Sequence, residues 1–139
     1  MKKSRTKTVR GWGPIKYVTI KNVPVRYSEK HGEIIDMSPH EIERRIAVAL
    51  LEHRVPICGN ELKILKSAIG LSFEEMANSI GVSKNSLVTW VKKEDQRLAI
   101  VHEIAIRVLA SEFLGVELHA TLDDLVADDK ARKINIEAA

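Results

Sequence analysis

The sequence is poor in cysteine, in aromatic residues and in long apolar runs. Its one cysteine, Cys58, excludes a disulfide within the chain and fits a reducing compartment. Aromatic residues make up 4% of the 139 residues, so a core drawn from the 45% apolar residues is aliphatic. No apolar run approaches the roughly 20 residues that cross a bilayer, and no apolar signal core follows the basic start. We therefore expect a cytoplasmic protein with no membrane partner.

A catalytic or cofactor-binding pattern is also missing. The chain has no glycine-rich phosphate loop, no paired carboxylates and no Ser–His–Asp arrangement. A structural zinc ion needs four ligands, and the five histidines show no ligand spacing: His31, His40, His53, His102 and His119. Cys58 has no neighbouring histidine to activate it and fits better as a small, buried residue. We expect no enzyme activity, no cofactor and no metal.

Positive charge gathers at the start of the chain, although the net charge is only +3. Residues 1–13 contain no acid and five basic residues: Lys2, Lys3, Arg5, Lys7 and Arg10. Without hydrophobic periodicity, residues 1–13 are predicted to form a flexible basic arm. This arm is either a solvated tail or a segment that lies along DNA phosphates, as basic arms do in some DNA-binding proteins.

Residues 14–37 read as a small antiparallel β module. Residues 15–20 are rich in β-branched and aromatic side chains and form a strand that Asn22 and Pro24 interrupt. Two short strands follow at residues 25–27 and 33–35, around a turn at residues 28–32. Such a sheet is marginal alone, so it must pack on a helix or pair across a dimer.

Residues 38–115 carry helical periodicity, which makes the chain mainly α in an α+β fold. The first helix is capped by Ser38 and runs to about residue 53, and the second covers residues 61–68 and ends at Gly70. A long helix over residues 98–114 is apolar on more than one side, with Val101 assigned to its main flank. We expect it both to cross the core and to meet another subunit. Residues 116–139 are predicted to be a polar, loosely held tail with a short acidic helix at residues 122–127.

Residues 72–93 contain the start and stop signals of two short helices joined by a tight turn. Ser72 and Glu75 form a capping box, Gly81 ends the first helix, and Ser83 caps the second. Six apolar side chains are expected to pack the pair together: Met76, Ala77, Ile80, Val82, Leu87 and Trp90. Small polar and basic residues are left on the outer face of the second helix, which suits the DNA major groove.

The stretch GLSFEEMANSIGVSKNSLVTW resembles the Cro-like helix-turn-helix family of phage repressors, also called the XRE family. Together with KYVTIKNVPVRY and GNELKILKSAIGLS, it is similar to the MqsA/HigA-type antitoxins and small transcriptional regulators. The resemblance implies a five-helix DNA-binding core, repression of the protein's own operon and a cognate toxin partner. Two features depart from it: the zinc-binding cysteine pairs are absent, and Phe73 stands where many relatives place a phosphate-binding polar residue.

Distinct DNA contacts are assigned to individual residues. Base edges are read by Lys84, Asn85 and Thr89, since an amide matches adenine and an ammonium matches guanine, while a threonine contacts either a thymine methyl or a base-edge acceptor. The DNA backbone is bound by Ser83, Ser86, Lys92 and Lys93, with help from the basic arm. The plainer interpretation of the same side chains is an ordinary polar helix face.

These observations predict a sequence-specific, double-stranded DNA-binding repressor of antitoxin type. One recognition helix reads few base pairs, so we expect a homodimer on a palindromic operator. Two alternatives stay open at this point. One is a phage or mobile-element regulator without a toxin, and the other is a protein-interaction module that has lost DNA binding.

Overall fold

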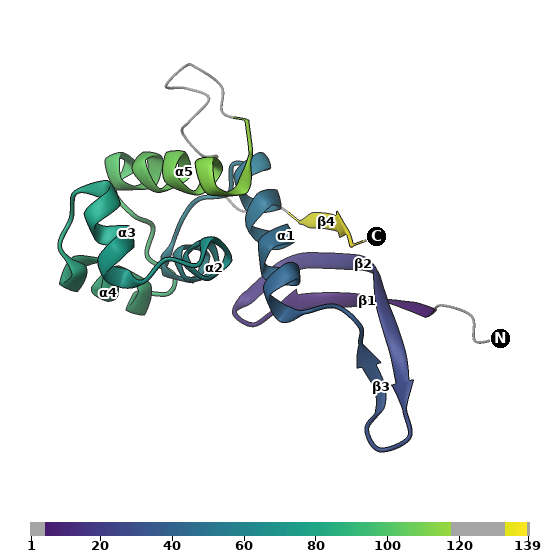
Figure 1. Ribbon diagram of the computed structural model, residues 1–139. Coiled ribbons are helices and arrows are strands. Elements are labelled where there is room, and N and C mark those ends of the chain that lie inside the picture. Colours follow the sequence, from purple (N-terminus) through teal and green to yellow (C-terminus); the bar gives the residue numbers. More distant parts are fainter. Residues whose placement is uncertain (1–4, 118–132, 139) are drawn as a thin grey trace.

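The computed structural model describes residues 5–117 and 133–138, and it has the expected α+β composition (Figure 1). The described residues contain five helices: α1 Pro39–Glu52, α2 Gly59–Ile69, α3 Phe73–Ile80, α4 Lys84–Lys92 and α5 Ile100–Leu114. Four strands form a single sheet: β1 Arg5–Trp12, β2 Ile15–Ser28, β3 Gly32–Ile35 and β4 Ile134–Glu137. Figure 1 shows α3 and α4 at one end of the molecule and the sheet at the other.

The first strand corrects the prediction of a flexible arm over residues 1–13. Residues Arg5–Trp12 form β1, which pairs antiparallel with β2 through partners such as Val9–Ile20 and Trp12–Ile15. Trp12 and Val9 pack partly buried against the core, so two side chains of a basic segment are enough to dock it. Residues 1–4 lie outside the described part of the chain.

The second strand runs through the point where a break was expected. β2 extends without interruption across Asn22 and Pro24, so the prediction of two separate strands is wrong. The pairs Lys7–Val23 and Val9–Ile20 enclose one more residue of β2 than of β1, which is the signature of a β-bulge. Asn22 adopts φ +57 there, a left-handed conformation that asparagine tolerates better than most residues. The bulge absorbs the irregularity and the strand continues.

The fourth strand corrects the prediction of a loose tail and of a purely antiparallel sheet. β4 pairs parallel with β2 along residues 18–21, and Ala138 N donates to Lys21 O at 3.0 Å. Ile134, Ile136 and Ala138 are buried, which anchors this end of the chain in the core. The short helix expected at residues 122–127 lies outside the described residues.

The helix boundaries agree closely with the local signals. Ser38 Oγ accepts a hydrogen bond from Glu41 N at 3.1 Å, and His53 follows the last residue of α1. α2 ends at Gly70 and α5 at Gly115, both in the left-handed conformation. Buried side chains from the sheet and the helices, including Ile20, Ile46 and Leu62, belong to one hydrophobic cluster. No helix within residues 5–117 is long and apolar enough to span a membrane.

The orientation of α5 differs from the prediction. Val101, assigned to the core flank, is 76% exposed, and Ile100 and Phe113 are each about half exposed. Ile106, which was assigned to a different flank, is fully buried instead. Because nearly every side of this helix is apolar, periodicity alone does not select the face that enters the core.

A buried ion network lies on the inner side of α5. Glu103 is fully buried, and its carboxylate accepts hydrogen bonds from Ile57 N at 2.8 Å and from Arg97 Nε and Nη2 at 3.1 Å each. Arg107 lies 3.9 Å from the same carboxylate and donates to Val55 O. Burial lowers the pKa of Arg107 and the Glu103 charge opposes that shift, so the two groups depend on each other.

Removal of the Glu103 carboxylate is expected to destabilise the fold strongly. Glu103→Ala leaves Arg107 buried without its counter-charge and Ile57 N without its acceptor, which costs about 3–5 kcal/mol of unfolding free energy. Urea denaturation followed by circular dichroism measures the change, with Glu112→Ala at an exposed position of α5 as the control. An unfolding free energy equal to that of the control variant contradicts this role.

Candidate nucleic-acid interface

Helices α3 and α4 form the tight helical pair that the capping residues predicted. Ser72 Oγ accepts from Glu75 N, and Glu75 Oε1 accepts from Ser72 N, both at 3.1 Å. This hydrogen bond from the Ser72 backbone lowers the pKa of Glu75. Gly81 ends α3 with φ +74, and Ser83 Oγ accepts from Ser86 N at the start of α4. The prediction of two helices joined by a turn is therefore confirmed.

Packing between the two helices follows the expected apolar positions, with one correction. Met76, Ala77 and Leu87 are buried, and Ile80 and Val82 are partly buried. Trp90 is not enclosed as expected: it is half-buried, and its ring stacks on that of His102 with centroids 4.5 Å apart. Trp90→Ala is therefore expected to lower the free energy of unfolding by less than the roughly 3–5 kcal/mol that loss of a fully buried tryptophan costs.

The outer face of α4 presents the three predicted base-reading residues together. Lys84, Asn85 and Thr89 are all exposed, and Asn85 and Thr89 lie one turn apart. Thr89 Oγ1 donates to Asn85 O at 2.9 Å, so its hydroxyl proton is already used within the helix. The methyl group of Thr89 and the free amide of Asn85 remain available for contact with another molecule.

The predicted backbone contacts divide into two groups. Lys92 and Lys93 are exposed at the end of α4, close to the base-reading residues in the chain. Ser83 and Ser86 point toward each other, with their hydroxyl oxygens 2.8 Å apart. Each serine therefore supports the start of α4 as well as being placed near its outer face.

The basic residues of the first strand are not brought to the same surface. Arg5, Lys7 and Arg10 belong to β1, a strand of the sheet, and α2 lies between this strand and α4 in Figure 1. Lys7 forms an ion pair with Glu33 of β3 at 3.7 Å. Lys2 and Lys3 lie outside the described residues. A surface built around α4 must therefore work without Arg5, Lys7 and Arg10.

The start of α2 supports the end of α4 through a contact that the sequence did not reveal. A Cβ atom on Gly59 would lie 2.5 Å from Trp90 O and 2.6 Å from Lys93 O, so only glycine fits here. Asn60 N donates to Glu94 O at 3.1 Å, just beyond α4. The position of α4 is thus fixed by backbone contact with α2.

Glu61 extends this support to the sheet. Its carboxylate accepts from Cys58 N and from Tyr17 OH of β2, each at 3.0 Å. Glu61 stands three residues after Cys58, as in a capping box, and this spacing is the sequence signal for the bond between the Glu61 side chain and Cys58 N. Burial, followed by the Glu61 charge, raises the pKa of Cys58 to about 11, so its thiol is protonated and unreactive at neutral pH.

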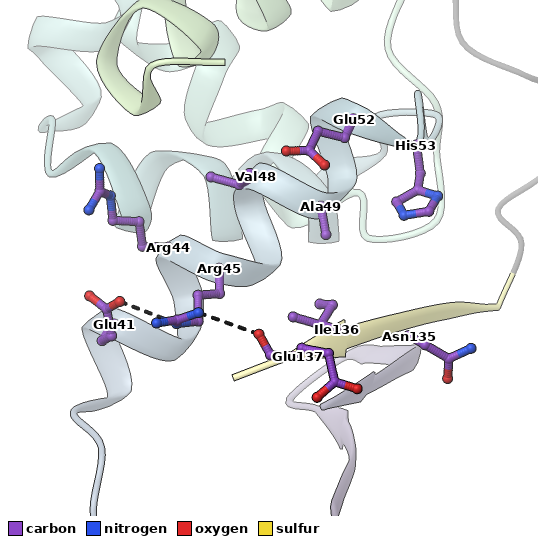
Figure 2. Close-up of a pocket in the computed structure, with 10 residues that line it drawn as sticks. All are labelled: Glu41, Arg44, Arg45, Val48, Ala49, Glu52, His53, Asn135, Ile136 and Glu137. Carbon is purple, nitrogen blue, oxygen red and sulfur yellow. Dashed lines mark hydrogen bonds and ion pairs between the residues drawn. The ribbon is translucent and has the colours of Figure 1, made fainter. Parts of the chain in front are cut away.

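A hollow of about 410 Å³ lies between α1 and β4 (Figure 2). Its charged side chains are largely engaged with the protein itself: Arg45 pairs with Glu41 at 3.3 Å and donates to Glu137 O at 3.4 Å. Arg44 also lines the hollow and is exposed. These contacts show how α1 holds β4. Within the described residues, no cluster of three or more side chains is suited to bind a metal ion.

Comparisons with known proteins add no family to this description. No protein-family model matches the chain, and searches of curated proteins and of solved structures found no match either. The candidate interface therefore rests on the chain's own residues and their geometry.

A side chain at position 59 is expected to disturb the end of α4. Gly59→Ala forces the start of α2 away from Trp90 O and Lys93 O, an overpacking that costs about 1–3 kcal/mol of unfolding free energy. Thermal unfolding measures this loss, with Lys63→Ala at an exposed position of α2 as the control. Equal melting temperatures for the two variants show that α2 and α4 are not in the close contact described.

Proposed function

We propose that this protein is a sequence-specific repressor that binds double-stranded DNA through α4. The observation that carries the proposal is the outer face of α4, where Lys84, Asn85 and Thr89 are exposed on a helix capped and held by α2 and α3. A helix of this size fits the major groove, and the preceding helix crosses the DNA backbone in such motifs. Binding of α4 in the major groove explains why polar side chains that make no contribution to the core are held on a rigid helix.

Each side chain on this face has a matching partner on DNA. The Asn85 amide pairs with N6 and N7 of adenine, and the Lys84 ammonium donates to O6 or N7 of guanine. The Thr89 methyl contacts the thymine methyl, which agrees with a hydroxyl already bonded to Asn85 O. Lys92, Lys93 and the two serines of the α4 start bind phosphates and set the register of the helix without reading sequence.

Two copies of the protein are proposed to bind one palindromic operator. α5 supports this, because Ile100, Val101 and Phe113 expose large apolar side chains that a lone DNA-binding domain has no use for. The buried charges Glu103 and Arg107 face inward, so the exposed side of α5 carries apolar side chains together with a single acidic residue, Glu112.

The repressor is further proposed to act as an antitoxin whose sheet binds a toxin protein. The β2–β3 hairpin extends away from the helices (Figure 1), and Tyr27 on it is 70% exposed. Exposed tyrosines are frequent anchors of protein interfaces. Copurification of a neighbouring gene product through this hairpin supports an antitoxin, whereas repression without any bound protein identifies a plain regulator.

Replacement of Asn85 is expected to affect specific DNA far more than random DNA. Asn85→Ala removes a bidentate base contact, so affinity for the operator falls by about 1–3 kcal/mol and non-specific affinity changes little. Gel shifts with the DNA upstream of the gene, and with scrambled DNA, measure both. Lys92→Ala is the matched control on the same helix, and it weakens both DNAs alike.

Equal losses on both DNAs for Asn85→Ala show that Asn85 holds the backbone or the fold and reads no base. Absence of binding by the unmodified protein to either DNA refutes the proposed function itself.

A charge on the outer face of α5 is expected to separate the subunits. Val101→Glu places a carboxylate on the most exposed apolar position of α5, where desolvation in a dimer is unfavourable. Sedimentation at micromolar concentration should show a monomer for this variant and a dimer for both the unmodified protein and Lys63→Glu. A Val101→Glu variant that stays dimeric places the interface elsewhere, and a monomeric unmodified protein contradicts the dimer.

A further inference from the structure

Phe73 and Lys66 form a pair at the junction of α2 and α3. Phe73 is the first residue of α3 and packs partly buried against the core. Lys66 belongs to the last turn of α2, and its Nζ lies over the Phe73 ring, 4.3 Å from the ring centroid. At this distance the negative face of the aromatic ring attracts the ammonium group.

We propose that Lys66, held over the Phe73 ring, binds a phosphate of the DNA backbone at the start of α3. This inference rests on the proposed function and adds a contact to it, since Lys66 lies outside α3 and α4. Phe73 is then a positioning residue that touches no DNA and places the lysine.

The location of the pair follows from how α4 enters DNA. With α4 in the major groove, the preceding helix α3 crosses the sugar–phosphate backbone. Phe73 begins this helix and has no group that donates a hydrogen bond to phosphate. The Lys66 ammonium carries three donors, and even with one of them turned toward the ring, two remain for a phosphate. The lysine of this pair therefore provides the phosphate-binding donor that the phenyl ring lacks.

The charge of Lys66 is not neutralised by the protein. In the described part of the chain, no carboxylate lies within ion-pair distance of its ammonium. Glu75, nearby at the start of α3, turns back to accept from Ser72 N, and Glu43 accepts from Ser67 Oγ. Glu74 is exposed and remains the one acid of this helix start without such a bond among the described residues, so it weakens the contact without removing it.

A purely structural role is the competing explanation, in which the lysine and the ring only fasten α2 to α3. The two roles differ in their dependence on salt. A phosphate contact releases a counterion, so it contributes about 0.9 to the slope of log affinity against log salt concentration. A structural fastening changes the melting temperature and leaves that slope unaltered.

The test measures binding of the full chain to a labelled DNA duplex of mixed sequence between about 50 and 200 mM salt, because phosphate contacts do not depend on sequence. We expect Lys66→Ala to lower the slope by about 0.9 and Lys63→Ala, an exposed lysine one turn earlier on α2, to leave it unchanged. An unchanged slope for Lys66→Ala overturns the inference, as does an equal fall in both variants.

A second pair of variants tests the positioning role of Phe73. Phe73→Leu keeps an apolar side chain but removes the aromatic face, so it should weaken DNA binding several-fold when Lys66 is present. In the Lys66→Ala background the same substitution should have no further effect on affinity. Additive losses in the double variant refute the pair, even where both single variants bind less well.

A wrong Lys66 contact and a wrong proposed function give different experimental results. If the unmodified protein binds the duplex and Lys66→Ala keeps its slope, only the Lys66 contact is wrong. If the unmodified protein binds no DNA at any of these salt concentrations, the proposed function falls and the Lys66 contact falls with it.

Discussion

The carboxylate of Glu103 is the interaction on which the arrangement of the helices depends. It accepts from Ile57 N and Arg97, while Arg107 beside it donates to Val55 O. A buried charge without partners costs several kcal/mol. The loop between α1 and α2 must therefore keep the conformation that places Ile57 N and Val55 O next to Glu103 and Arg107. The same loop conformation places Gly59 against the end of α4. The position of α4 is thus set in part by a charge on a different helix, α5.

A second joint connects the helices to the sheet. Tyr17 of β2 donates to Glu61, which also accepts from Cys58 N at the start of α2. Residues of α2 therefore contact both β2 and the end of α4, and the side chains of sheet and helices share one core. For the proposed repressor this has a direct meaning: a protein bound to the sheet is held at a constant position relative to DNA on α4.

Local signals in the sequence were sufficient for the helices and insufficient for the sheet. Caps and terminal glycines act within a few residues, so Ser38, Ser72, Gly81 and Ser83 located helix ends correctly. β1 was missed because its residues are mainly polar and basic, although its partner β2 follows directly in the chain. β4 was missed because its partner, residues 18–21 of β2, lies far earlier in the chain. The face of α5 was misassigned because apolar residues surround it, and the one cue was the i,i+4 pair of Glu103 and Arg107 within that helix. Likewise, nothing near Trp90 in the sequence announced His102 as its partner. The base-reading and phosphate-binding roles remain predictions, supported by exposure and geometry.

The pairing of β4 with β2 has a consequence for how the protein is made. Asn22 and Glu137, which bond across this pair, are separated by 115 positions, and all five helices are translated between them. During synthesis the edge of β2 at residues 18–21 stays open until the ribosome has released β4. An open strand edge recruits other chains, so a prematurely terminated product exposes a surface prone to aggregation and degradation.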